Sequence, residues 1–280
     1  MRALPTLGGH NGEAAATNNR GQVVGTAENT SPDPSCSPFQ SAPPVLWEKG
    51  QPQELLTFPG DRDGIATSIN DLGQAVGSSG SWCGTLNHGL LWENGTVTYL
   101  PSLGGAMYNI PYGINDQGQV VGVSDLAGDA TAHAVLWQGS VASDLGTLPG
   151  DSYSEADGIN RQGQVVGGSC GENGCSAILW QDGTMTDLNK LIPAGSALYL
   201  YFAHAINSRG DIVGMALWNG TSEFHAFLAT LTNPTIGDVN LTLTPGAPRP
   251  RPRVTLPLSL RKLLQRQRSF GRFGRLRKWQ

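Results

Sequence analysis

The chain lacks any apolar run that approaches the length of a membrane span, and its apolar segments are shorter than the roughly ten residues that a helix needs. Residues 1–231 are also poor in cations, with seven Lys and Arg against 21 Asp and Glu, a formal charge of −14. A segment this acidic repels nucleic acid and anionic membranes, so we expect no specific nucleic-acid partner for it. Glycine and proline are abundant instead, 38 and 18 of 280 residues, which favours a turn-rich all-β protein.

An eight-residue phrase, Asn-x-x-Gly-x-x-Val-Gly in loose form, occurs five times, and its asparagines are 52, 45, 45 and 47 residues apart. A second phrase, of the type VLWEKG, has tryptophans that are 45, 45 and 43 residues apart. The shared period indicates an array of one supersecondary unit, as in propellers and solenoids. The asparagines are Asn18, Asn70, Asn115, Asn160 and Asn207, and the tryptophans are Trp47, Trp92, Trp137 and Trp180.

Each repeat is predicted to form four antiparallel strands. In the third copy, MYNIPYGI, QVVGVS and HAVLW are short apolar or β-branched runs, and a fourth strand ends in DLGTLPG. The turn NDQG separates the first two runs, with Asn opening it and Gly able to adopt a positive φ. Four-stranded units at this period are typical of the blades of a β-propeller.

The chain ends favour a closed ring. The pattern of the fifth repeat fails where a fourth strand is due, and ALPTLGG from Ala3 resembles the fourth-strand segment YLPSLGG from Tyr99. We therefore expect an N-terminal strand to complete the last blade and to remove two open sheet edges. Residues 1–231 are predicted to form a closed propeller of about five blades; the alternative is an open array cut from a longer protein.

These phrases resemble the HAF-repeat family, an extracellular repeat of bacterial proteins named for the tripeptide that stands here at His225, Ala226 and Phe227. The combination of INDQGQVVG with HAVLW carries the resemblance, which extends over the propeller segment. The fifth copy departs from the pattern because it lacks the third-strand Trp. The resemblance implies a secreted repeat protein and supplies no catalytic residue.

The loops are expected on two faces of the ring. The turns between first and second strands keep a constant length, whereas the loops between second and third strands vary. Variable loops on a rigid scaffold commonly carry binding, so the long first-repeat loop AENTSPDPSCSPFQSAPP is the leading recognition element.

All four cysteines fall in the variable loops. Cys170 and Cys175 bracket GENG at a hairpin tip, where facing residues come close enough for a disulfide. Cys36 and Cys83 would then pair between the first two blades, with free thiols as the alternative. Disulfides favour an oxidising, extracellular or cell-envelope compartment. MRALPTLGG contains no apolar signal region, so for an exported protein we expect the natural start to lie upstream.

The C-terminal part carries the opposite charge, with 11 basic residues against Asp238 alone, a formal charge of +10. Residues 232–258 are a Pro/Thr-rich linker, and residues 259–280 are a basic tail that has an amphipathic helical pattern around Leu260, Leu263 and Leu264. Three interpretations stay open: docking on the acidic ring, binding an anionic membrane or polymer, and disorder.

Five acidic residues are the candidate site residues. Asp61, Asp63, Asp151, Glu155 and Asp157 lie on blade connections that lead to innermost strands near the channel mouth. Ordinary turn chemistry explains them first, Ca²⁺ binding second and acid/base catalysis third.

Two functions follow. The first is a secreted, non-catalytic scaffold that binds a carbohydrate, polymer or protein through the variable-loop face, with no cofactor. The second is a propeller hydrolase or lyase that acts on carbohydrate with carboxylates at the channel mouth. Enzymatic propellers carry a cluster of His, Arg and acidic residues around the channel, and only seven basic residues serve this whole ring, so binding is favoured.

Overall fold

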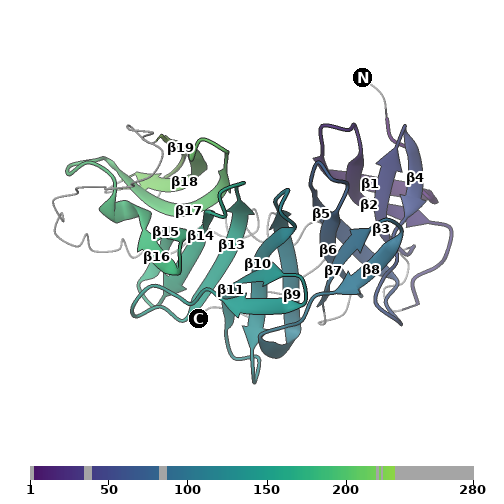
Figure 1. Cartoon of the computed structure of the whole chain (residues 1–280), viewed down its shortest axis with the longest axis horizontal. Helices are drawn as coiled ribbons and strands as arrows, with labels where there is room; N and C mark the ends of the chain where they lie inside the picture. Colours follow the sequence, from purple (N-terminus) through teal and green to yellow (C-terminus); the bar gives the residue numbers. More distant parts are fainter. Residues whose placement is uncertain (1–2, 35–39, 82–86, 219–220, 222, 231–280) are drawn as a thin grey trace.

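The computed structural model describes residues 3–34, 40–81, 87–218, 221 and 223–230. These residues form five antiparallel sheets that follow one another along the chain as propeller-like blades (Figure 1). The first sheet, blade 1, contains β1 (Gly8–Thr17), β2 (Val23–Asn29), β3 (Pro44–Glu48) and β4 (Gln51–Glu54). Blade 2 contains β5 (Asp63–Ile69), β6 (Ala75–Gly80), β7 (Asn87–Glu93) and β8 (Thr96–Tyr99). Blade 3 contains β9 (Gly104–Ile114), β10 (Gln119–Leu126), β11 (Ala132–Gln138) and β12 (Val141–Asp144).

Blade 4 contains β13 (Tyr153–Ile159), β14 (Val165–Gly171), β15 (Gly174–Gln181) and β16 (Thr184–Asp187), and a 3-10 turn, η1 (Leu188–Lys190), follows it. Blade 5 contains β17 (Leu198–Ile206), β18 (Ile212–Trp218) and β19 (Phe224–Ala229). The predicted four-stranded antiparallel unit is confirmed in the first four blades. Figure 1 shows the blades along an arc, with blade 1 at one end and blade 5 at the other.

The hydrophobic core is divided among the joints between neighbouring blades. At the joint between blades 3 and 4, Val121 of β10 packs with Ala156 of β13 and Val165 of β14, and all three are fully buried. In blades 1 to 3 the repeated tryptophan fixes the connection that leads into its own blade. Trp137, for example, is fully buried and its Nε1 donates to the Pro101 carbonyl at 2.7 Å, and Trp47 and Trp92 make the same bond to the carbonyls of Pro5 and Leu56. Apolar burial and one hydrogen bond therefore account for the tryptophan phrase.

The repeat asparagines form a hydrogen-bonded ladder that crosses every joint. Asn115 Oδ1 accepts from the backbone N–H groups of Gln117 and Gln119 at 3.1 and 3.0 Å, which closes its own turn. Asn115 Nδ2 donates to the carbonyl of Asn160, the next repeat asparagine, at 3.0 Å. The same amide-to-carbonyl bond joins Asn18 to Asn70 and Asn70 to Asn115 at 2.9 Å, and Asn160 to Asn207 at 3.1 Å. One side chain thus shapes a turn and links two blades.

The first strand of every blade carries a β-bulge three residues before the repeat asparagine. In blade 4 the pairing of β13 with β14 passes from Ala156 to Gly158 and skips Asp157, and in blade 5 the pairing of β17 with β18 skips His204. The register skips the matching residues of the other blades, Ala15, Thr67 and Tyr112. A bulge redirects the side chain of the extra residue, so these positions differ from ordinary strand positions.

The structure does not show the expected closure by the N-terminal strand. Blade 5 has three strands among the described residues, and residues 3–7 lie against blade 1. The Pro5 carbonyl accepts from Trp47 Nε1 at 2.7 Å, and the Leu7 N–H donates to the Glu28 carbonyl at 3.1 Å. Residues 3–7 therefore take the place in blade 1 that the connection around Pro101 takes in blade 3, and this accounts for the sequence similarity that suggested closure.

The expected bridge between Cys170 and Cys175 is confirmed. The two residues face each other on β14 and β15 with their Cα atoms 4.0 Å apart, and they form a disulfide. Its presence indicates an oxidising, non-cytoplasmic compartment. Within the part of the chain that the structure describes, no helix is long and apolar enough to cross a membrane. Cys36, Cys83, and the linker and basic tail (residues 232–280) lie outside the described residues, so their roles stay predictions.

Replacing both Cys170 and Cys175 by Ser is expected to lower the free energy of unfolding by about 2 kcal/mol, because the bridge closes a short loop in the unfolded chain. Urea unfolding followed by tryptophan fluorescence measures the change. The control is the same double variant with and without reductant, since any redox response that it retains comes from Cys36 and Cys83. Alkylation of Cys170 and Cys175 in non-reduced protein would contradict the prediction.

Candidate functional site

The bulged positions bring together one predicted site residue and a histidine. Asp157 Oδ2 lies 2.8 Å from His204 Nδ1, so a carboxylate of blade 4 pairs with an imidazole of blade 5. Both side chains are accessible, at 17% for Asp157 and 41% for His204. A carboxylate that orients an imidazole is a common element of acid/base sites. The pair is therefore a candidate for the catalytic alternative.

Similar pairs occur elsewhere in the array. His88 Nδ1 lies 2.8 Å from Asp61 Oδ2 in blade 2, and His133 Nδ1 lies 2.9 Å from Asp144 Oδ1 in blade 3. The two histidines occupy corresponding positions on third strands. Their carboxylate partners come from different positions, the connection before β5 and the end of β12. A His–carboxylate contact is thus a recurrent structural feature of this chain, and it does not by itself mark a catalytic centre.

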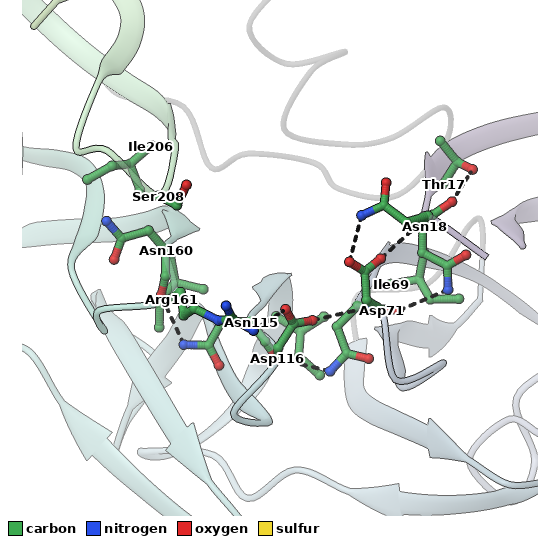
Figure 2. Close-up of a pocket in the computed structure, with 14 residues that line it drawn as sticks. Thr17, Asn18, Ile69, Asp71, Asn115, Asp116, Asn160, Arg161, Ile206 and Ser208 are labelled. Carbon is green, nitrogen blue, oxygen red and sulfur yellow. Dashed lines mark hydrogen bonds and ion pairs between the residues drawn. The ribbon is translucent and has the colours of Figure 1, made fainter. Parts of the chain in front are cut away.

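A polar pocket of about 300 Å³ lies at the repeat-asparagine turns and draws on all five repeats. Three neighbouring positions of the repeat line it: the residue before the asparagine, the asparagine itself, and the residue after it. Figure 2 shows these side chains following one another from repeat to repeat. The lining residues are Thr17, Asn18, Asn19, Ile69, Asn70, Asp71, Ile114, Asn115, Asp116, Ile159, Asn160, Arg161, Ile206 and Ser208.

The residue after each asparagine forms a second row of contacts between blades. Asp71 receives two hydrogen bonds from Asn19, from the backbone N–H at 2.9 Å and from the side-chain amide at 2.6 Å. The backbone N–H of Asp71 in turn donates to Asp116 Oδ1 at 3.1 Å, and Arg161 lies 3.8 Å from Asp116 Oδ2. The row therefore runs from an amide through two neighbouring carboxylates to a guanidinium.

Asp71 is held as an anion. The backbone N–H of Asn19, then its side-chain amide, and the charge of Arg161 lower the pKa of the Asp71 carboxyl below its ordinary value. The stability that these contacts contribute is fully present above the ordinary carboxyl pKa, and it is lost as the pH falls through the lowered one. The negative charge at this point of the pocket thus persists at neutral and mildly acidic pH.

Arg161 is the member of this row that is best placed to contact a ligand. Its side chain is 68% exposed, and its contact with Asp116 is a loose ion pair at 3.8 Å. Exposed pairs of this kind contribute little to stability, so the guanidinium is available for other partners. An exposed guanidinium above amide and carboxylate groups supplies both donors and acceptors to a polar ligand.

The structure gives Asp61 and Asp151 matching roles in two blade connections. Asp61 Oδ2 accepts from Ser79 Oγ at 2.6 Å, and Asp151 Oδ2 accepts from Ser169 Oγ at 2.7 Å. In each case the same serine oxygen also accepts a backbone N–H from the turn before the aspartate. These contacts stabilise the turns, as the first interpretation of the acidic residues expected.

The other predicted acidic residues are dispersed. Asp63 is fully buried, and its Oδ1 accepts from the Ala42 N–H at 2.9 Å, which anchors the long loop of blade 1. Glu155 is 2% exposed and accepts from the Tyr153 hydroxyl at 2.5 Å. Among the described residues, no cluster of three or more His, Cys, Asp and Glu side chains suited to hold a metal ion is found.

The polar pocket was not predicted from the sequence, which pointed to the variable-loop face at the opposite ends of these strands. A signal for it exists: the residue after the repeat asparagine varies among the copies (Asn, Asp, Asp, Arg and Ser), whereas the turn around it is nearly constant. Side chains that vary on a constant turn are candidates for specificity. The long loop of blade 1 lies partly outside the described residues, and recognition by it stays a prediction.

No family model and no curated protein matches the chain. Three solved structures are similar to it at low identity. Dipeptidyl peptidase 4 of Porphyromonas gingivalis is 12% identical with a TM-score of 0.41, and the match covers 71% of this chain and 34% of that one. The chain therefore spans about a third of that protein.

The second is the β-propeller domain of the Trilobed protease from Pyrococcus furiosus, described as having an open velcro topology. It is 11% identical with a TM-score of 0.44, and the match covers 77% of this chain and 68% of that one. The third, YCF48 bound to D1 peptide, is 14% identical with a TM-score of 0.39, and the match covers 80% of this chain and 69% of that one. Similarity at this level assigns no activity to the chain.

Proposed function

We propose that the chain is a non-catalytic binding scaffold of the extracellular space or cell envelope, and that it binds a carbohydrate in the pocket at the repeat-asparagine turns. The pocket carries the proposal, because it gathers hydrogen-bonding side chains from all five repeats at one place. The Cys170–Cys175 disulfide supports the compartment.

The chemistry of the pocket favours a neutral polyhydroxylated ligand. Asp71 and Asp116 accept hydrogen bonds from sugar hydroxyls, Arg161 and Asn19 donate them, and Ile114 and its equivalents add apolar surface for a sugar ring. A polyanion would meet the two carboxylates and a propeller segment with a formal charge of −14, so it is disfavoured.

Binding fits the array better than catalysis does. The His–carboxylate pairs recur in blades 2 and 3 and between blades 4 and 5, and Asp61 and Asp151 support turns. The alternative, a hydrolase or lyase acting on carbohydrate, rests on Asp157 and His204. This alternative predicts that the wild-type protein cleaves carbohydrate and that the Asp157→Asn variant does not. Cleavage therefore separates the two functions.

Replacing Arg161 by alanine is expected to weaken carbohydrate binding about tenfold or more and to leave the melting temperature unchanged, because the exposed guanidinium contributes to the ligand and little to the fold. The full chain is first tested against immobilised gluco-, chito- and manno-oligosaccharides, and the strongest is titrated calorimetrically. Arg62→Ala is the matched control, since Arg62 is also exposed but lies on a blade connection.

Two results would overturn the proposal. Equal losses of affinity in Arg161→Ala and Arg62→Ala would place the ligand outside the pocket. Absence of binding to every oligosaccharide in the panel would remove the carbohydrate assignment. Release of shortened oligosaccharides by the wild-type chain, and none by Asp157→Asn, would establish the enzymatic alternative instead.

A further inference from the structure

The outer face of blade 5 exposes an apolar pair at the end of the arc. Val213 of β18 and Leu228 of β19 are directly paired across the two strands. Val213 is 44% exposed and Leu228 is 66% exposed. Neighbouring apolar side chains at the surface indicate an interaction site when the equivalent side chains of the other repeats are covered.

The earlier blades bury the valine position and partly bury the leucine position. The valine six residues after each repeat asparagine is fully buried in blades 1 to 4, where it packs against the first strand of the next blade. Val166, for example, lies in one cluster with Leu200 and Ala203 of β17. The equivalent valines are Val24, Val76, Val121 and Val166. The exposed face of blade 5 is thus a copy of four surfaces that each cover a following repeat.

The complementary surface is exposed at the other end of the arc. Ala14 of β1 is exposed, whereas the alanines at the same position of later blades, Ala66, Ala156 and Ala203, are fully buried against the preceding blade. Blade 1 therefore presents the first-strand face that blades 2 to 5 use to contact their predecessors.

The asparagine ladder ends in the same complementary way. At the last rung, Asn207 Nδ2 donates to Asp211 Oδ2 of its own turn at 2.8 Å, and no bond to a following repeat occurs among the described residues. At the first rung, the Asn18 carbonyl accepts from the Gly21 N–H at 3.1 Å and, at a longer 3.4 Å, from the Thr17 hydroxyl, which also donates to the Gln22 carbonyl at 3.0 Å. The carbonyl of Asn70 accepts the matching turn bond and also the amide of Asn18. Blade 5 thus has an amide donor, and blade 1 a carbonyl acceptor, for one more rung.

We propose that the outer face of blade 5 binds the first-strand face of blade 1 in a second copy of the chain, head to tail. The contact repeats the interface that already joins the blades, with Val213 and Leu228 against Ala14 and with Asn207 donating to Asn18. A second copy is the occupant because the two faces of one chain lie at opposite ends of the arc (Figure 1). A contact between two different faces is heterologous, so each copy keeps one face free for another.

The test uses one charged substitution on each face. Wild-type full-length chain is expected to show a molar mass that rises with concentration in sedimentation velocity and light scattering. Leu228→Glu and Ala14→Glu, each alone, are expected to weaken self-association about tenfold or more, because a carboxylate would be buried in an apolar joint. Val141→Glu is the matched control: Val141 is 62% exposed on β12, away from both faces.

Mixing the two variants supplies the decisive measurement. Leu228→Glu keeps an intact blade 1 face and Ala14→Glu keeps an intact blade 5 face, so the mixture is expected to form a one-to-one dimer that does not grow further. Since both positions are exposed, the variants are expected to retain the wild-type circular dichroism. If Leu228→Glu does not fold, Leu228→Ser probes the same contact.

Three outcomes would overturn the proposal. The first is a wild-type chain that stays monomeric at all concentrations. The second is a mixture of the two variants that stays monomeric while the wild type associates. The third is a monomeric wild type whose melting temperature falls in both single variants, which would show that the two faces close the ring within one chain. The proposal is independent of the carbohydrate pocket, because neither Ala14 nor Leu228 lines it.

Discussion

Replacing Gly122 by alanine is expected to lower the free energy of unfolding by about 3 kcal/mol or more, among the largest effects of any single methyl group in this chain. A Cβ atom at this position would lie 2.1 Å from the carbonyl oxygen of Ile110 and 2.8 Å from the Cα of Pro111. Both atoms belong to the backbone of the bulged strand β9, so rotation of a side chain cannot relieve the clash.

The same restriction holds in every repeat. A Cβ at the last glycine of the eight-residue phrase would meet a carbonyl oxygen of the first strand at 1.9 to 2.1 Å in all five blades. The residues are Gly25, Gly77, Gly122, Gly167 and Gly214. The bulge brings the first strand close to the second, and glycine is the residue that permits this approach.

Gly113→Ala is the matched control for Gly122→Ala. Gly113 lies in the same blade and pairs with Val121, but a Cβ there would meet its nearest atom at 3.4 Å, which is close to an ordinary contact. Urea unfolding followed by tryptophan fluorescence is expected to give a loss below about 1 kcal/mol for the control. Equal losses in the two variants would show that the close approach at Gly122 does not restrict the residue type.

The period, strand number and turn type could be predicted from the sequence because each depends on local chemistry. The asparagine and glycine of NDQG specify a turn, the flanking β-branched runs specify strands, and Trp137 marks the third strand. The bridge between Cys170 and Cys175 was predictable because the two cysteines are five residues apart on one hairpin.

The bulges and the pocket could not be predicted in the same way, because both depend on register. Asp157 and His204 are neighbours only because two adjacent strands each skip a residue at the same height. The bulged residues also share no side-chain type, so they leave no phrase in the sequence. Closure was expected from the similarity of ALPTLGG to later connections, and those residues prove to be the connection of blade 1.

Replacing Asn115 by alanine is expected to lower the free energy of unfolding by about 3 kcal/mol, because the 6%-exposed side chain makes four hydrogen bonds of about 0.5–1.5 kcal/mol each. Two of them close its own turn, one reaches Gln119 Oε1 and one crosses to the carbonyl of Asn160. Since the asparagine serves a turn and a joint together, its loss is expected to affect blades 3 and 4 together.

Asn207→Ala separates these two contributions. Asn207 closes its own turn through Arg209 and Asp211 in the same way, but it stands at the end of the ladder, where no following blade accepts its amide among the described residues. We expect a loss of about 1 kcal/mol for this variant, measured by urea unfolding at a protein concentration low enough to keep the chain monomeric. A loss equal to that of Asn115→Ala would show that the asparagine stabilises the turn alone. A clearly larger loss at Asn115 would identify the amide-to-carbonyl bond between repeats as the contact that makes neighbouring blades unfold together.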